Sequence, residues 1–120
     1  GMSIIFISHD LSVVRQVSHR VMVLYLGRVV EFADRDQIYL DPQHPYTQAL
    51  LSAVPVPDPR VRRSRILLTG EVPSASAPPA GCTFHSRCQH PAKDIECTRT
   101  VPPLHRDADG HAVACVKAAP

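Results

Sequence analysis

The stretch SIIFISHDLSVVRQVSHRVMVLYLGRVVEFA, residues 3–33, decides the fold class of this 120-residue chain. Residues 3–8, SIIFIS, form a short apolar run, which predicts a strand buried on both faces, as in the interior of a parallel sheet. Residues 9–20 place apolar side chains at helical spacing and predict a helix of about three turns. Asp10 is its expected N-cap, because a carboxylate there accepts from the first free amides. A strand followed by a helix indicates an α/β fold.

Three further elements are predicted downstream. Residues 21–34 hold two β-rich runs on either side of Gly27, the pattern of a hairpin. Residues 45–54, PYTQALLSAV, predict a short amphipathic helix with its proline at the first helical position. Residues 66–72, ILLTGEV, predict one more strand. His44, which precedes the second helix, is assigned to the turn that sets the angle of that helix and is given no catalytic role.

The prolines divide the chain into two parts. There are 12 of them, and all lie at Pro42 or later. Residues 55–65, PVPDPRVRRSR, read as a linker, because closely spaced prolines enforce extended backbone. The expected organisation is therefore an α/β part over residues 1–54. Residues 55–120 are expected to hold the linker and a small, mostly irregular region that contains the cysteines.

Charge and hydropathy exclude some classes of function. The net charge is +2 and the pI is about 8.5, which is too near neutral to indicate a nucleic-acid partner. No segment reaches the roughly 20 apolar residues that span a bilayer. The run IIFI lacks a cationic flank and is too short for the apolar core of a signal peptide. An intracellular chain is expected.

All four cysteines lie in the last third of the chain, with the spacing C-x5-C-x8-C-x17-C. Disulfides, a metal or iron–sulfur site, and unrelated thiols are the three alternatives. Four thiolates suit zinc and an iron–sulfur cluster equally, since both are soft-ligand sites. The spacing is wider than in common zinc or ferredoxin motifs and does not name the metal. Residues 70–120 have few large apolar side chains, so a bound metal or a crosslink is expected to order them.

An ordered series of short motifs identifies a resemblance. SHDL, YLGRVVE, HPYTQALL, GEVP and CTFHSRC follow one another, with a late cysteine after them. In this order they resemble the C-terminal part of the ATP-binding subunits of oligopeptide and dipeptide ABC importers. The fold implied by the resemblance is the truncated C-terminal part of an ABC ATPase domain, strand–helix–β-hairpin–helix. The family's cysteine-containing extension follows it.

The resemblance also implies roles for particular residues. His9, in the SHD turn, matches the switch histidine that contacts the γ-phosphate of ATP, and this role belongs to the longer parent protein. A [4Fe–4S] cluster is the cofactor implied for the cysteine region, with zinc or disulfides as alternatives and His85 and His90 as spare zinc ligands. The implied cluster ligands are Cys82, Cys88, Cys97 and Cys115.

The 120 residues lack other parts of an ATPase. No GxxxxGK[ST] phosphate loop and no LSGGQ-type signature occurs in them, so ATP and Mg²⁺ are expected in the longer parent alone. Whether to class the chain as an enzyme is left open; by itself it is expected to be inactive.

The implied setting is an importer complex. Its expected partners are a second ATPase subunit and transmembrane permease subunits, on the cytoplasmic, inner face of the cell membrane. The chain alone is expected to self-associate as a dimer or by strand swapping, because its first strand has no partner upstream. The rival hypothesis is a self-contained metal-binding or redox module without a transport role. Such a module should not begin with an unpaired apolar strand, and this feature separates the two hypotheses.

Overall fold

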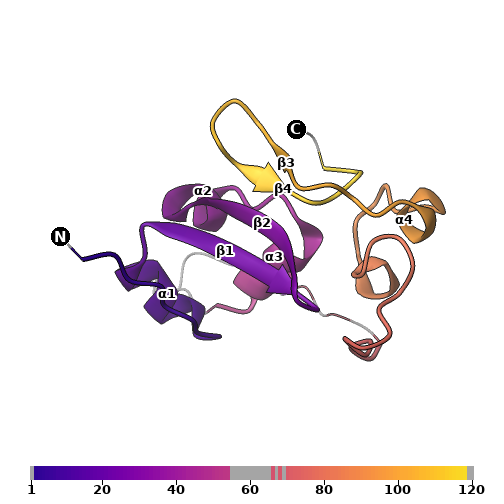
Figure 1. The fold of residues 1–120 in the computed structure, drawn as a ribbon, viewed down its shortest axis with the longest axis horizontal. Coiled ribbons are helices and arrows are strands. Elements are labelled where there is room, and N and C mark those ends of the chain that lie inside the picture. Colours follow the sequence, from indigo (N-terminus) through magenta and orange to yellow (C-terminus); the bar gives the residue numbers. More distant parts are fainter. Residues whose placement is uncertain (1, 55–65, 67, 69, 119–120) are drawn as a thin grey trace.

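The structure, a computed structural model, describes residues 2–54, 66, 68 and 70–118. In the first half of the chain a helix, a two-stranded hairpin and two further helices follow one another, and short elements with long connections follow in the second half (Figure 1). The linker expected at 55–65 lies outside the described residues. The elements are α1 (Leu11–Val17), β1 (Arg20–Tyr25), β2 (Arg28–Asp34), α2 (Arg35–Leu40), α3 (Pro45–Ser52), the 3-10 helix η1 (His85–Arg87), α4 (Glu96–Arg99), β3 (His105–Arg106) and β4 (Ala112–Val113).

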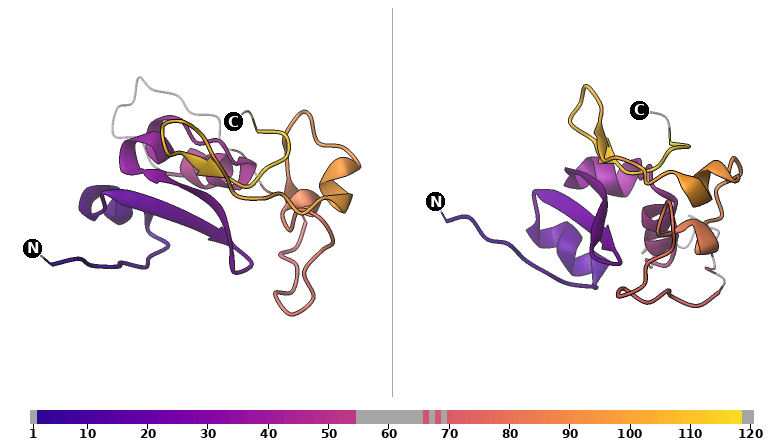
Figure 2. Two further views of the ribbon diagram at one scale, coloured as in Figure 1. Left: turned by 45° about the horizontal axis from the view of Figure 1, so that its top comes forward. Right: turned by 45° about the vertical axis from the view of Figure 1, so that its right-hand side comes forward.

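One four-stranded antiparallel sheet organises the molecule. Its strand order is β1-β2-β4-β3, so the last two strands of the chain complete a sheet that the early hairpin begins. In the β2–β4 ladder Val113 lies opposite Glu31, and Ala112 lies opposite Phe32. Figure 2 shows β4 running beside β2 in both views. The α/β part and the cysteine-containing part therefore share one sheet.

The predicted hairpin is confirmed, and its turn explains why it forms. Leu26 and Gly27 have φ values of +50° and +75°, and positive φ at both central residues is typical of the two-residue turn that matches strand twist. Along β1 the burial alternates, with Val21, Val23 and Tyr25 turned inward. The inward face packs against the helices, which lie behind the hairpin in Figure 1.

The first predicted helix is confirmed but is shorter than expected. Asp10 caps it as predicted, since its Oδ1 accepts from the backbone amides of Ser12 at 3.1 Å and Val13 at 3.3 Å. The helix ends at Val17 because Ser18 takes an extended backbone conformation. The Ser18 hydroxyl donates to the carbonyl of Val14, one turn earlier, and this local hydrogen bond competes with continuation of the helix.

The second predicted helix is confirmed as α3, with Pro45 at its first position. Helix α2 was not predicted. It begins directly after β2, and the side chain of Gln37 accepts from the Asp34 amide at 3.1 Å, one half of a capping box.

An aromatic cluster joins the cysteine-containing part to the rest of the core. Phe84 is fully buried. Its ring centroid lies 5.0 Å from that of Tyr25, 5.2 Å from Tyr46 and 5.7 Å from His44. These spacings are those of favourable aromatic pairs. The cluster fastens the segment around residue 84 to the end of the hairpin and to the start of α3.

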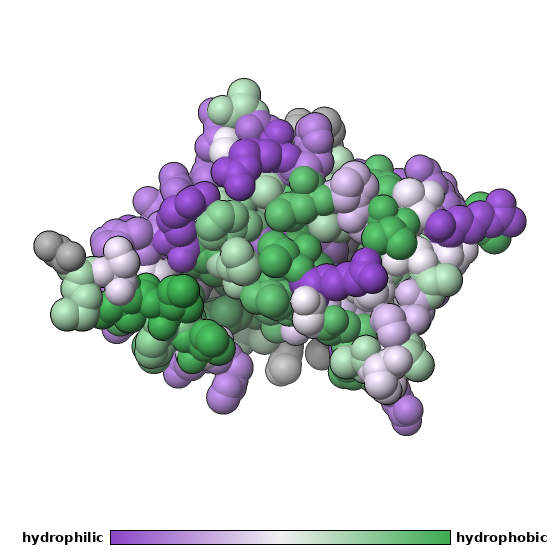
Figure 3. Space-filling view, in the orientation of Figure 1, coloured by the Kyte–Doolittle hydropathy of each residue, from purple (hydrophilic) through white to green (hydrophobic). Residues whose placement is uncertain are grey.

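The strand predicted over residues 3–8 is wrong. These residues have no regular secondary structure, and Ile4, Ile5 and Ile7 are 76%, 93% and 92% exposed. A doubly buried strand needs hydrogen-bonding neighbours and two covering layers, and the described part of the chain supplies neither to this segment. Apolar surface consequently extends over the N-terminal segment and across β1, where Met22 and Leu24 are half exposed (Figure 3).

The strand predicted over residues 66–72 is not formed by those of its residues that are described; residues 67 and 69 lie outside them. Among the helices of the described ranges, none combines the length and apolar character needed to cross a membrane.

Candidate functional site

Four cysteines that are scattered in the sequence line one cavity. They reach it from four different segments: a bend before η1, the end of η1, helix α4, and the second residue after β4. All four thiols are free, and His85 and His90 line the same cavity. The structure thus brings together all four predicted ligands and both spare histidines. The thiols belong to Cys82, Cys88, Cys97 and Cys115.

A close backbone contact joins the first cysteine to the third. The amide of Cys82 donates to the carbonyl of Cys97 at 2.9 Å. Gly81 makes this approach feasible, because a Cβ at its position would lie 2.6 Å from the Cys97 carbonyl oxygen. Its φ of +72° also belongs to the left-handed region that favours glycine. The glycine before the first cysteine is therefore required by the site.

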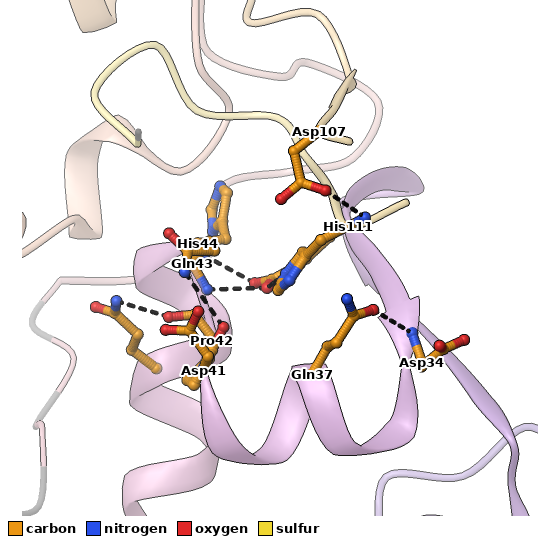
Figure 4. A network of polar contacts seen from close by, with 10 residues as sticks. Asp34, Gln37, Asp41, Pro42, Gln43, His44, Asp107 and His111 are labelled. Atoms are coloured by element: carbon orange, nitrogen blue, oxygen red, sulfur yellow. Dashed lines mark hydrogen bonds and ion pairs between the residues drawn. The ribbon is translucent and has the colours of Figure 1, made fainter. Parts of the chain in front are cut away.

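A buried carboxylate fixes the approach of β4, which leads to Cys115. The Glu31 side chain is fully buried, and its two oxygens accept from the amides of Gln43 and His44, both at 2.8 Å. One of these oxygens also pairs with the ring Nε2 of His111 at 2.5 Å. Asp107 holds the other side of His111 by accepting from its amide at 2.9 Å (Figure 4).

His44 is buried and fully engaged. Its Nδ1 accepts from the Tyr46 amide at 3.0 Å, so the imidazole caps helix α3. Burial lowers the pKa of His44 to about 4, and a hydrogen bond to the backbone of Ala114 opposes that shift. The imidazole is therefore neutral near pH 7, with its second nitrogen directed at the residue before Cys115.

An ion-pair cluster lies at the wall of the cavity. Lys117 lines the cavity and donates to Asp94 Oδ2 at 2.9 Å and to Glu96 Oε2 at 2.8 Å. These bonds raise the pKa of Lys117 and lower the pKa of Asp94. The cluster joins the segment after Cys115 to the helix that carries Cys97.

The electrostatics of the cavity favour the protonated form of two of the thiols. Burial raises the pKa of both Cys82 and Cys88, and the neighbouring thiols raise both values further. Backbone amides oppose this; the amide of His90, for example, donates to the Cys88 sulfur at 3.4 Å. Several thiolates at this spacing repel one another, and a positively charged centre among them would remove the repulsion.

The described residues present no ready-made coordination sphere for a metal. Among the residues that the structure describes, no group of three or more His, Cys, Asp or Glu side chains is arranged to hold one metal ion. Zinc bonds thiolates at about 2.3 Å and needs all its ligands in one coordination sphere. A [4Fe–4S] cluster spreads four cysteines over four irons. The enclosed space is about 10 Å³, the size that admits one water molecule, so a cluster requires the surrounding loops to open.

His9 lies apart from this site. It is exposed, at the bend before α1, and the N-terminal segment lies at the opposite end of the molecule from α4 (Figure 1). Sequence reasoning did not find Glu31, His111 or the bridging role of His44. Glu31 carries a usable signal, since it is an acidic residue inside an apolar strand run.

Comparison with known proteins identifies the family. Residues 30–97 match the model of the oligopeptide/dipeptide transporter C-terminal region. A probable peptide ABC transporter ATP-binding protein of Sinorhizobium fredii is 53% identical over the whole chain, which covers 33% of that relative. The oligopeptide transport ATP-binding proteins OppF of Salmonella typhimurium and Escherichia coli are 50% and 48% identical, and the chain covers 36% of each.

The chain thus spans about a third of the length of the curated relatives it matches. The matched residues include most of the hairpin strand β2, all of helix α3 and three of the four cysteines. The family match takes in more than half of the chain, and this chain belongs to the oligopeptide/dipeptide transporter C-terminal region family.

Proposed function

We propose that this chain is the C-terminal part of the ATP-binding subunit of a peptide ABC importer, and that its four cysteines hold a [4Fe–4S] cluster. One observation carries the cluster assignment: four free thiols, drawn from four separate segments, line one cavity. Unrelated thiols have no reason to converge. The matched relatives, which are named as ATP-binding proteins of peptide transport, support the importer.

The cysteine thiolates are the proposed ligands, one for each iron: Cys82, Cys88, Cys97 and Cys115. When bound, such a cluster supplies either one-electron chemistry or a rigid crosslink. The chain itself supplies the surroundings. Burial raises the pKa of Cys88, and the charge of Lys93 opposes part of that rise. The ion pairs of Lys117 with Asp94 and Glu96 hold two of the cysteine segments together. The amide of His90 donates to a ligand sulfur, as outer hydrogen bonds to metal ligands commonly do.

The ATPase reaction belongs to the longer protein in this proposal. His9 contacts the γ-phosphate there, while ATP and Mg²⁺ are bound mainly by residues outside these 120. Without a phosphate loop the isolated chain lacks the backbone cradle and lysine that hold the phosphates, so it does not hydrolyse ATP. The exposed position of His9, ahead of α1, is compatible with a contact made to other parts of the longer protein.

The proposed partners are a second ATPase subunit and the transmembrane permease subunits, at the cytoplasmic face of the membrane. The exposed isoleucines before α1 support a larger assembly, since fully burying each one would contribute about 1.5–3 kcal/mol. In the isolated chain the same residues are proposed to drive self-association.

A domain exchange tests the importer proposal. The matching C-terminal third of Salmonella OppF is replaced by this chain, and uptake of a labelled oligopeptide is measured in cells that lack OppF. Uptake well above the deletion strain is expected. In the same chimera, His9→Ala is expected to slow ATP hydrolysis by about 100-fold, the usual effect of removing one transition-state contact. A chimera present at normal amounts that imports nothing would contradict the proposal.

A further inference from the structure

We propose that the segment His44–Tyr46 is the platform that sets the geometry of the cysteine site, with the His44 imidazole as the positioning residue for Cys115. The inference rests in part on the proposed cluster, since it concerns the same four thiols. It goes further by naming the residues outside the cysteine loops that determine where those thiols lie.

The two ring nitrogens of His44 each have a separate task. Nδ1 accepts from the Tyr46 amide at 3.0 Å, and this fixes the tautomer with the proton on Nε2. That second nitrogen faces the backbone of Ala114 and bonds to it. The Ala114 amide already donates to the Val30 carbonyl at 2.8 Å, which leaves the Ala114 carbonyl as the acceptor for the imidazole. With both nitrogens engaged, His44 lines the cavity without serving as a ligand.

The bond to Ala114 acts one residue from Cys115. At this point the chain leaves β4 and enters the wall of the cavity, and Cys115 itself is not part of the strand. A tether on residue 114 therefore determines the direction in which the next side chain leaves the sheet. The main chain of His44 is fixed in turn, because its amide donates to the buried Glu31 carboxylate at 2.8 Å (Figure 4).

The same short segment also holds the other cysteine loops. The side chain of Gln89, next to Cys88, donates from Nε2 to the Pro45 carbonyl at 3.0 Å. The rings of His44 and Tyr46 both pack on Phe84, two residues beyond Cys82. Cys97 follows indirectly, because its carbonyl accepts from the Cys82 amide. Four contacts from three consecutive residues thus hold the segments of three cysteines directly, and the segment of Cys97 through Cys82.

Substitution of His44 separates its two tasks. His44→Asn keeps a good N-cap for α3 but is too short to reach Ala114. In the reduced, metal-free chain we expect alkylation of Cys115 to become about fivefold faster, the change that follows the loss of one hydrogen bond. After anaerobic reconstitution we expect iron affinity to fall about 10- to 100-fold, with altered visible absorption of the iron that remains.

The matched control is His19→Asn, which changes an exposed histidine away from the cavity and should alter neither readout. Circular dichroism checks that the helices remain. Should His44→Asn fail to fold, Gln89→Ala removes the second tether from an exposed position and is expected to speed alkylation of Cys88. Unchanged alkylation in whichever variant folds overturns the inference.

The two proposals fail in distinguishable ways. In one outcome, the wild-type chain binds iron and His44→Asn binds it with equal affinity and an identical spectrum. That result would contradict the positioning role of segment His44–Tyr46 and leave the proposed [4Fe–4S] cluster intact. If the wild-type chain binds no iron while His44→Asn still exposes Cys115 to alkylation, the cluster is wrong and the positioning role of His44 stands.

Discussion

Glu31 and His111 lie 80 positions apart in the sequence and meet as a buried pair, with 0% and 5% of their side chains exposed. The pair joins β2 to the loop that precedes β4. It also lies one hydrogen bond from His44, because the same carboxylate accepts from the His44 amide. The position of the last cysteine therefore depends on a residue in the middle of an early strand.

Removal of Glu31 is expected to be costly. Glu31→Leu leaves the His111 ring and two backbone amides buried without their acceptor, so we expect the free energy of unfolding to fall by about 3–5 kcal/mol. Urea denaturation measures the change. Asp36→Ala is the control, because it removes a carboxylate from an exposed pair with Arg35 and should cost less than about 1 kcal/mol. Equal losses in the two variants would contradict the account of the buried pair.

The stability of the metal-free chain should depend on pH through His44. Its pKa is about 4 in the folded chain and 6.5 ordinarily. As the pH falls below 6.5 the unfolded chain takes up a proton, while the folded chain does not until about pH 4. Stability is therefore lost between pH 6.5 and pH 4, by about 3 kcal/mol from this group. Urea unfolding at several pH values measures the free energy of unfolding, and His44→Asn should lack this loss. If the free energies of the wild type and the variant fall in parallel as the pH is lowered, the prediction is contradicted.

Gly81 provides a test of how the cysteine loops are packed. Gly81→Ala places a methyl group against the Cys97 carbonyl and should break the contact between the first and third cysteine segments. We expect iron binding to fall about 10- to 100-fold. Gly110→Ala is the matched control, since it has a similar φ of +83° but nothing within 4 Å of the added Cβ. Loss of iron binding in both variants would show that backbone strain causes the loss, and would contradict the role given to the contact with the Cys97 carbonyl.

Local signals explain what the sequence could predict of the fold. Gly27 marked the hairpin turn, Pro45 marked the start of α3, and Asp10 marked the start of α1; each acts within a few residues. Residues 3–8 show the opposite case. Their apolar character was read correctly, but strand formation depends on neighbours that the described part of the chain does not supply. Helix α2 is only six residues long and carries little periodic signal.

The site was predictable in composition and not in arrangement. Four thiols in one region suggested a common centre, and the structure brings them to one cavity. Which residues position them depends on tertiary contacts. Glu31 is a charge inside an apolar strand run, a signal that the sequence reasoning did not use, and nothing near it in the sequence indicates His111 as its partner. The role of His44 similarly requires β4 to be in place.

The exposed N-terminal isoleucines predict self-association of the isolated chain. We expect sedimentation velocity to show dimers or larger species, and the double variant Ile5→Lys/Ile7→Lys to be monomeric. Leu40→Lys alters another exposed apolar side chain and should leave the association unchanged. A wild-type chain that is monomeric over a wide concentration range would contradict this prediction.

Analysis of iron, sulfide and zinc in the anaerobically purified chain, together with its visible spectrum, tests the central claim most directly. The account predicts about four irons and four sulfides per chain, with broad absorption near roughly 400 nm, and loss of both in a Cys97→Ser variant. One zinc per chain, or four freely titratable thiols with no metal even after reconstitution, would contradict it.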